Sequence, residues 1–292
     1  MKKCLKVLSI ASCMFLAMVI VACGEKNEET EELKTSGNET ADVAEDISDD
    51  DFEWEENIIS AISDQGAKQK KVVIPSRCEG FGDKRLLDMT DADIEEVSFE
   101  SDEDIELGGV FASAPNLKKV VLPAKLTKID TMEFINCPKL EAIEIPTGVN
   151  AIGEYSFQDN LALTEVLLDE NGAATAIGPH AFDGCSSLKD ITFADAITSI
   201  GEYAFYKCAS LETVTLPKGL SEVGKYAFAN SGLKELYVPA EVELQAVDAT
   251  SFVQADHEVK VYVVEGSWFD QNFDIIMGEG FEKIYYDGVT TD

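Results

Sequence analysis

The fold is decided by residues 211–228, which read LETVTLPKGLSEVGKYAF. The first part of this stretch has apolar side chains at Leu211, Val214 and Leu216. Polar residues separate them, and the alternation at its end is typical of a short β-strand with one buried face. The proline that follows has a fixed φ and no backbone N–H, so it ends the strand. A second apolar pair, a glycine and Phe228 complete a unit that cannot bury its apolar side alone.

This unit recurs along most of the chain with a nearly fixed period. Phenylalanines in register with Phe228 are spaced by steps of 23, 23, 25, 23, 23 and 24 residues. They are Phe111, Phe134, Phe157, Phe182, Phe205, Phe228 and Phe252. Such a period predicts a solenoid in which stacked units bury one internal file of phenylalanines. Cys185 and Cys208 each stand three residues after a phenylalanine of this file, and we expect both to be free thiols that fill the core.

The repeated pattern L-x-x-I-x-L-P-x-x-[LV]-x-x-I-G-x-x-A-F-x-x-C resembles the leucine-rich repeats of the BspA type, which occur in bacterial surface proteins. The resemblance covers about residues 72–263. It departs from the pattern where Asp169 and Ala194 replace the proline and where Asp130 replaces the glycine. The resemblance implies adhesion or the binding of host components.

The sequence therefore predicts an α/β solenoid, a leucine-rich-repeat array of short parallel strands with single helical turns, capped at both ends. A single helical turn is expected in the four residues that end at each phenylalanine, as in Glu202–Phe205. We expect residues 58–110 to form an N-terminal cap with atypical first repeats, residues 111–258 the leucine-rich repeats, and residues 259–292 a C-terminal cap. Caps are expected because an uncovered solenoid would expose apolar faces at its ends.

The N-terminus has the features of a bacterial export signal. A positive start followed by a short apolar run predicts a signal peptide over residues 1–22 rather than a membrane span. The cysteine after Ala22 resembles the bacterial lipobox, which implies cleavage before Cys23 and attachment of lipid to it. An uncleaved anchor helix and a plain signal peptide are the alternatives. We expect an extracytoplasmic protein on the bacterial cell surface, held to the membrane through the lipid anchor alone.

Charge defines the next segment and excludes some partners. Residues 23–57 hold fifteen acidic residues and few apolar ones, which predicts an acidic, disordered tether. The whole chain has 23 basic and 56 acidic residues and a formal net charge of −33 at pH 7. This balance argues against binding to nucleic acid, because phosphate contacts need a basic surface, and against docking on anionic lipid head groups.

No pattern typical of catalysis appears in the sequence. His180 stands two residues before a repeat phenylalanine, a position that other units fill with Met132, Tyr155, Tyr203 or Tyr226, so we expect it to pack in a ladder. His257 has no partner nearby in the sequence. Nucleophile elbows, metalloprotease zinc motifs and phosphate-binding glycine loops do not occur. We expect no enzyme, no cofactor and no metal, although calcium on the acidic surface and a catalytic carboxylate pair remain open alternatives.

The remaining candidates for function are surfaces. Residues between the apolar strand positions point away from the core and form a sheet face, on which neighbouring strands align their side chains in files. We predict that a partner binds this face at Lys189, Thr192, Glu212, Thr215, Glu235 and Tyr237. Tyr237 is the best single anchor, because exposed aromatic residues often dominate binding energy.

These observations together predict a lipid-anchored cell-surface binding module that recognises an extracellular protein or glycan. The first alternative is a structural or assembly protein of the cell envelope. The second is a hydrolase with an unrecognised carboxylate site.

Overall fold

A computed structural model of the chain describes residues 49–82, 92–168, 172–254 and 256–288. The predicted signal peptide over residues 1–22, the lipidation of Cys23 and most of the predicted tether lie outside the described residues.

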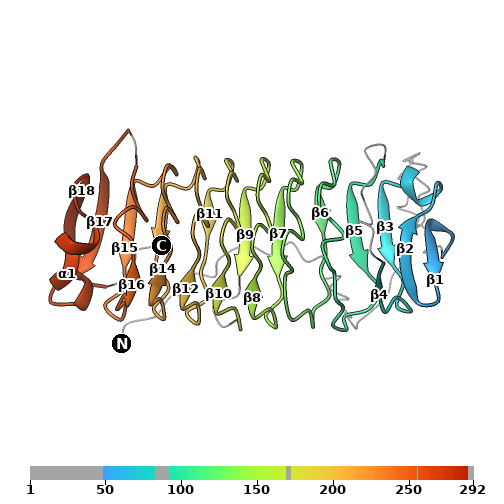
Figure 1. Ribbon diagram of the computed structural model, residues 1–292, viewed down its shortest axis with the longest axis horizontal. Coiled ribbons are helices and arrows are strands. Elements are labelled where there is room, and N and C mark those ends of the chain that lie inside the picture. Colours follow the sequence, from blue (N-terminus) through green and yellow to red (C-terminus); the bar gives the residue numbers. More distant parts are fainter. Residues whose placement is uncertain (1–48, 83–91, 169–171, 255, 289–292) are drawn as a thin grey trace, which may run out of the picture. The chain divides into compact units, whose positions relative to one another are not determined.

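Short parallel strands in one long series form the sheet face. Each repeat contributes one strand, and successive strands lie side by side (Figure 1). Hydrogen bonding divides the series into three sheets, in the orders β3-β5-β6, β7-β9-β11 and β13-β15-β17-β18. The strands are β3 (Lys71–Ile74), β5 (Glu96–Phe99), β6 (Lys119–Val120), β7 (Ala142–Ile145), β9 (Glu165–Leu168), β11 (Asp190–Ile191), β13 (Thr213–Thr215), β15 (Glu235–Val238), β17 (Val259–Val264) and β18 (Phe281–Tyr286).

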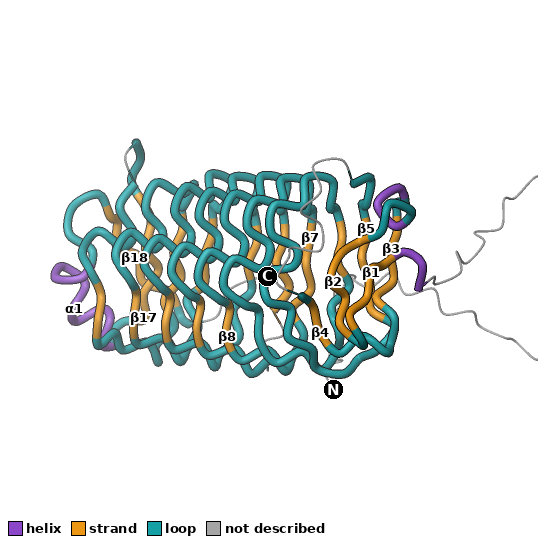
Figure 2. Tube along the Cα trace, turned by 45° about the vertical axis from the view of Figure 1, so that its right-hand side comes forward, coloured by secondary structure: helices purple, strands orange, loops and turns teal. Residues whose placement is uncertain are grey.

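A second series of strands runs along another side of the repeats, and loops and turns join the two series (Figure 2). It contains a five-stranded parallel sheet of β8 (Ala151–Ile152), β10 (Ala176–Ile177), β12 (Ser199–Ile200), β14 (Glu222–Val223) and β16 (Ala246–Val247). A further three-stranded sheet contains β1 (Phe52–Glu55), β2 (Ile58–Ile62) and β4 (Gly80–Phe81). The helical elements are the 3₁₀ turns η1 (Asp49–Asp51) and η2 (Gly66–Lys68) and the helix α1 (Trp268–Ile276).

Folded structure begins earlier than the predicted boundary at residue 57. β1 pairs with β2 in antiparallel fashion, and its first residue, Phe52, is buried. The guanidinium of Arg77 lies 3.5 Å from the centre of the Trp54 ring. Phe52 and the half-buried Trp54 are the first aromatic residues of the acidic stretch, and burial of Phe52 together with the Arg77–Trp54 contact favours folding here despite the surrounding charges. The described end of the predicted tether is therefore ordered.

The core contains the predicted file of phenylalanines. All seven repeat phenylalanines are buried. From Phe111 to Phe252, neighbouring ring centres are 5.0–5.4 Å apart, and the ring planes deviate from parallel by at most 10°. This spacing matches the distance between hydrogen-bonded strands, about 4.8 Å, so one repeat length places each ring on the next. The predicted stacking is confirmed.

The segments before each phenylalanine are not helical turns, which corrects the expected α/β class. Across residues 202–207 the chain forms hydrogen-bonded turns, and Tyr203 and Lys207 have left-handed φ values of 57° and 59°. The N–H groups of Tyr203 and Phe205 donate to carbonyl groups of the next repeat, at 2.9 Å and 2.7 Å. Because these donors hold the neighbouring repeat, they cannot enter an α-helical ladder within their own segment. Within the described residues α1 is the single α-helix, and the architecture is a parallel β-solenoid.

Buried cysteine thiols join three of the repeats to their neighbours by hydrogen bonds. The thiol of Cys185 donates to the carbonyl oxygen of Phe157 at 3.0 Å, and that of Cys208 to the carbonyl oxygen of Phe182 at 3.2 Å. Asn160 takes the same role in the repeat between Cys137 and Cys185, because its amide donates to the Phe134 carbonyl oxygen at 2.8 Å. Cys185 and Cys208 are free thiols, as predicted.

One junction between repeats uses side-chain carboxylates as acceptors. The N–H of Thr127 donates to Asp104 Oδ1 at 3.0 Å, whereas the equivalent N–H of Asn150 donates to a backbone carbonyl. The N–H of Gly109 donates to Glu133 Oε2 at 2.7 Å. Glu133 has no exposed surface, and its Oε1 has no hydrogen-bond partner in the part of the chain that is described. Burial raises the pKa of this carboxyl to about 7.

Candidate binding surface

The outward side chains of the sheet face lie in files because the strands pair in register. Thr215 on β13 lies beside Tyr237 on β15, and Tyr237 lies beside Tyr262 on β17. In the adjacent file, Glu235 lies between Thr213 and Lys260. Rigid strands hold these side chains at spacings of about 4.8 Å.

Three tyrosines form a cluster toward the C-terminal end of this face, and we call Tyr237, Tyr262, Tyr286 and the carboxylate of Glu235 the tyrosine cluster. The rings of Tyr237 and Tyr262 stack with their centres 4.4 Å apart and their planes 6° from parallel. Tyr286 lies edge-on to both rings, with centre distances of 5.8 Å and 6.4 Å. The cluster thus combines ring surface with one acidic group.

Glu235 organises the polar side of the tyrosine cluster. The hydroxyl of Tyr237 donates to Glu235 Oε2 at 3.4 Å, and that of Tyr262 donates to Oε1 at 3.3 Å. Burial and the nearby Glu235 carboxylate raise the pKa of both tyrosines, so both hydroxyls stay protonated and remain donors at neutral pH. Among the described residues, no basic side chain lies within ion-pair distance of Glu235. The carboxylate therefore retains acceptor capacity for a cationic or hydroxyl group from outside.

The predicted partner-binding residues lie on this face, but they are not one site. Thr215 lies beside the tyrosine cluster, to which Tyr237 and Glu235 belong. Thr192 and Lys189 are exposed next to β11, two strands from β15. Glu212 forms an ion pair with Lys234, so its charge is already compensated.

Sequence reasoning missed Tyr262 and Tyr286, which lie beyond the regular repeats. The signal for Tyr262 was available, because the alternating stretch Val259–Val264 predicts an outward side chain at this position. Placing it next to Tyr237 requires the strand register, which the irregular spacing after Phe252 conceals.

The second aromatic surface is a packed ladder, as expected for His180. The His180 ring stacks between Tyr155 and Tyr203, with centre distances of 4.7 Å and 4.8 Å. Its Nδ1 lies 2.9 Å from Asp183 Oδ2. Because the rings cover one another's faces, mainly their edges are left for contact with a partner.

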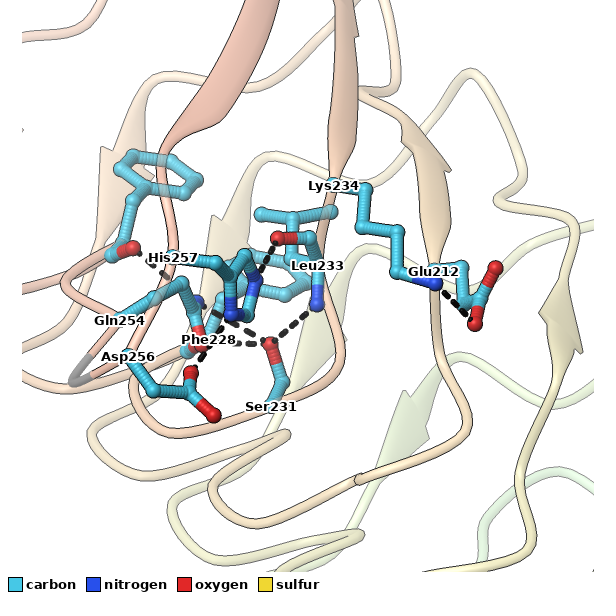
Figure 3. Close-up of polar contacts among 9 residues, drawn as sticks. Glu212, Phe228, Ser231, Leu233, Lys234, Gln254, Asp256 and His257 are labelled. Carbon is cyan, nitrogen blue, oxygen red and sulfur yellow. Dashed lines mark hydrogen bonds and ion pairs between the residues drawn. The ribbon is translucent and has the colours of Figure 1, made fainter. Parts of the chain in front are cut away.

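His257 belongs to a network that ties the last turns together (Figure 3). Its Nε2 lies 2.6 Å from the carbonyl oxygen of Leu233, and its Nδ1 lies 2.6 Å from Asp256 Oδ1. Nearby, the hydroxyl of Ser231 and the amide of Gln254 donate to the carbonyl oxygen of Phe228 at 2.7 Å and 2.8 Å. These partners are backbone carbonyls and neighbouring side chains, so the network joins successive repeats.

The described part of the chain lacks two features, a metal-binding group of side chains and a membrane-spanning helix. It contains no group of three or more His, Cys, Asp or Glu side chains placed to hold a metal ion. It also contains no helix with the length and apolar character needed to cross a membrane.

Comparisons with solved structures find leucine-rich-repeat proteins of low sequence identity. A leucine-rich repeat protein from Bacteroides ovatus is 16% identical, with a TM-score of 0.48, and the match covers 78% of this chain and 63% of that one. For a leucine-rich repeat protein of T. pallidum the identity is 20%, the TM-score 0.43 and the coverage 80% and 97%. A leucine rich cell surface protein from Faecalibacterium prausnitzii is 16% identical, with a TM-score of 0.32, and the match covers 79% of this chain and 84% of that one.

The family assignment rests on the repeat itself. No curated protein matches the sequence. The model of the BspA type leucine-rich repeat region matches residues 103–234 and 175–258 in six copies, which together span more than half of the chain. The chain belongs to the BspA-type leucine-rich-repeat family.

Proposed function

We propose that the protein is an extracytoplasmic binding module that recognises a protein or glycan partner through its sheet face. The observation that carries this proposal is the tyrosine cluster. The rings of Tyr237 and Tyr262 stack on each other, and both hydroxyls donate to the carboxylate of Glu235. Membership of a repeat family supports binding over catalysis, because such arrays present extended surfaces. The Faecalibacterium prausnitzii match, described as a cell surface protein, suggests the same location for this chain.

The tyrosine cluster suits recognition for two physical reasons. Stacked rings on paired strands have little conformational freedom left to lose, so binding costs little side-chain entropy. Tyrosine also offers apolar ring surface and a hydroxyl together, a combination common in residues that dominate binding. We assign the anchor role to Tyr237, with Thr215 beside it as a peripheral contact.

The ends of the solenoid and its attachment complete the proposal. We infer that the sheet containing β1 and the helix α1, which buries Phe269 and Phe273, cover the apolar ends of the array. We also propose that the protein is anchored by lipid on Cys23, with the acidic stretch that follows serving as a spacer.

Lipid attachment predicts a specific labelling result. Metabolic labelling with a fatty acid should mark the wild-type protein and should not mark Cys23→Ser, since the thiol is the attachment point. Release of the variant into the medium is the second readout. Equal labelling of the two proteins would contradict lipid attachment at Cys23.

Binding through the tyrosine cluster is tested on immobilised matrix proteins and mucin. Tyr237→Ala should weaken the binding of whichever probe retains the wild-type protein by at least about tenfold, the usual effect of removing a dominant anchor. Thr215→Glu should weaken it through charge and bulk placed beside the anchor. Tyr285→Ala is the matched control, because Tyr285 is 55% exposed and lies outside the tyrosine cluster.

The same experiment separates the alternatives. If a variant that lacks residues 24–48 loses binding while Tyr237→Ala keeps it, the acidic stretch and not the sheet face is the binding site. Retention of an envelope protein, and of no matrix protein or mucin, would indicate an assembly role. Product release in a glycan-hydrolysis screen would indicate a hydrolase.

A further inference from the structure

A shallow groove of about 610 Å³ opens on the sheet face over β6 and β7 and reaches β9, far along the series from the tyrosine cluster. Its lining includes three exposed apolar residues, Val121, Ala142 and Leu167. Val121, directly after β6, is 50% exposed, and Leu167 on β9 is 44% exposed, so two large apolar side chains face solvent close together. We call this feature the apolar groove.

The apolar groove is acidic at its rim. Glu141 and Glu144 line it, and no basic side chain of the described residues lies within ion-pair distance of either. Lys118 compensates these charges only in part, because its ammonium group pairs with Glu95 at 2.7 Å and interacts with Glu141 only at longer range. Hydrogen bonds from Lys118 and Lys70 together lower the pKa of Glu95 to about 2. Lys119 is the remaining basic side chain in the lining, so the carboxylates are left in excess.

Apolar and acidic groups alternate along the groove. Glu144 is paired in register with Leu167, and Val121, which directly follows β6, occupies the same position in the preceding repeat. Neighbouring strands are about 4.8 Å apart, and alternate side chains of an extended peptide are about 6.6 Å apart. An extended segment that crosses the strands can therefore place an apolar side chain against Val121 or Leu167 and a basic one near Glu144.

We propose that the apolar groove binds an extended polypeptide segment of a protein partner, in which leucine-like side chains and lysine or arginine alternate at every second residue, so that both kinds point to the same side. This inference rests on the proposed function, since it uses the same sheet face, and it names the chemistry of the partner. A glycan is disfavoured because the groove lining contains no aromatic ring on which a sugar could stack. Anionic lipid is disfavoured because its head groups would meet Glu141 and Glu144.

The test uses a defined probe, a fluorescein-labelled octapeptide in which leucine and lysine alternate at every second position, with serine at the positions between them. Binding to the full chain is followed by fluorescence anisotropy at low ionic strength. We expect saturable binding that Leu167→Ser weakens by about fivefold, through lost apolar burial. Glu144→Gln should weaken it by about threefold, and added salt should remove most of that difference.

Control peptides and variants decide the result. Leu161→Ser should leave binding unchanged, because Leu161 is 51% exposed but does not line the groove. The same peptide with glutamate in place of every lysine, or with serine in place of every leucine, should bind at least about fivefold more weakly, since each lacks one of the two complementary features. Equal binding of either peptide, or full binding by Leu167→Ser, would overturn the proposal.

Two further arms separate this inference from the proposed function. If Tyr237→Ala weakens probe binding and Leu167→Ser does not, the sheet face remains the binding surface and the apolar groove is excluded. If a neutral hexasaccharide of glucose binds and the leucine–lysine peptide does not, the partner class is a glycan and the groove proposal is wrong. If neither probe binds while Tyr237→Ala still loses retention on the matrix proteins or mucin, the groove proposal alone fails.

Discussion

Replacing Phe205 with alanine should lower the free energy of unfolding by about 3–5 kcal/mol. Phe205 is fully buried, and its ring stacks between Phe182 at 5.2 Å and Phe228 at 5.0 Å. Phe193 packs edge-on at 5.8 Å. The substitution therefore removes ring contacts on two repeats at once and leaves a cavity that rigid paired strands cannot close.

Denaturant titration followed by circular dichroism measures this loss. Tyr285→Ala is the control, because that tyrosine is 55% exposed and should cost far less. A repeat array can unfold in stages, so the transition is also followed by a probe placed near Phe205. A loss under about 1 kcal/mol for Phe205→Ala would contradict the stacked file of phenylalanines.

Replacing Glu133 with glutamine should stabilise the protein at about pH 8 by about 3 kcal/mol and leave its stability at about pH 4 nearly unchanged. Burial raises the pKa of the Glu133 carboxyl from 4.5 to about 7, so folding favours the protonated form. This contribution to stability is fully present below about pH 4.5 and is lost as pH rises through about 7. Glutamine is neutral at every pH, and its amide oxygen can still accept from the Gly109 N–H.

The pH dependence of unfolding distinguishes Glu133 from the many exposed acids. Glu154→Gln is the matched control, since it removes one acid at an exposed position. Parallel stability curves for wild type and Glu133→Gln across this range would show that the Glu133 carboxyl is not buried in the folded chain.

The sequence predicts the repeat core well because one period fixes both the strand pairing and the stacking of side chains. The spacing of the phenylalanines places Phe205 between Phe182 and Phe228 without any knowledge of the turns. The turns themselves were predicted less well. Tyr203 and Lys207 adopt left-handed φ although neither is glycine, so the usual sequence signal for this conformation is missing.

The junction at Glu133 and the first strand illustrate two other limits. Glu133 replaces the small residue that precedes the phenylalanine in other repeats, such as Ala204, so an acid in a core position was visible in the sequence. Its partner Gly109 was not, because that contact depends on the irregular turn before Phe111. β1 was missed because the prediction rested on the composition of the whole segment. The many acidic residues around β1 dominate that composition, and its two aromatic residues change it little.

The candidate site was predictable on one strand and not across strands. Alternation along β15 places Tyr237 outward, and regular repeats place Thr215 beside it. The spacing changes after Phe252, so the sequence does not align Tyr262 or Tyr286 with Tyr237. A site built by contacts between the last repeat and the segment after it therefore needs the structure.

Photo-crosslinking on living cells tests recognition through the sheet face most directly. The full chain carries p-benzoylphenylalanine in place of the half-buried Tyr237 or, as the control, in place of Glu222 on β14 of the second series, where the side chain is exposed. Irradiation followed by mass spectrometry should recover one partner, covalently joined through position 237 and not through position 222. Adducts formed through position 222 alone would contradict binding through the sheet face.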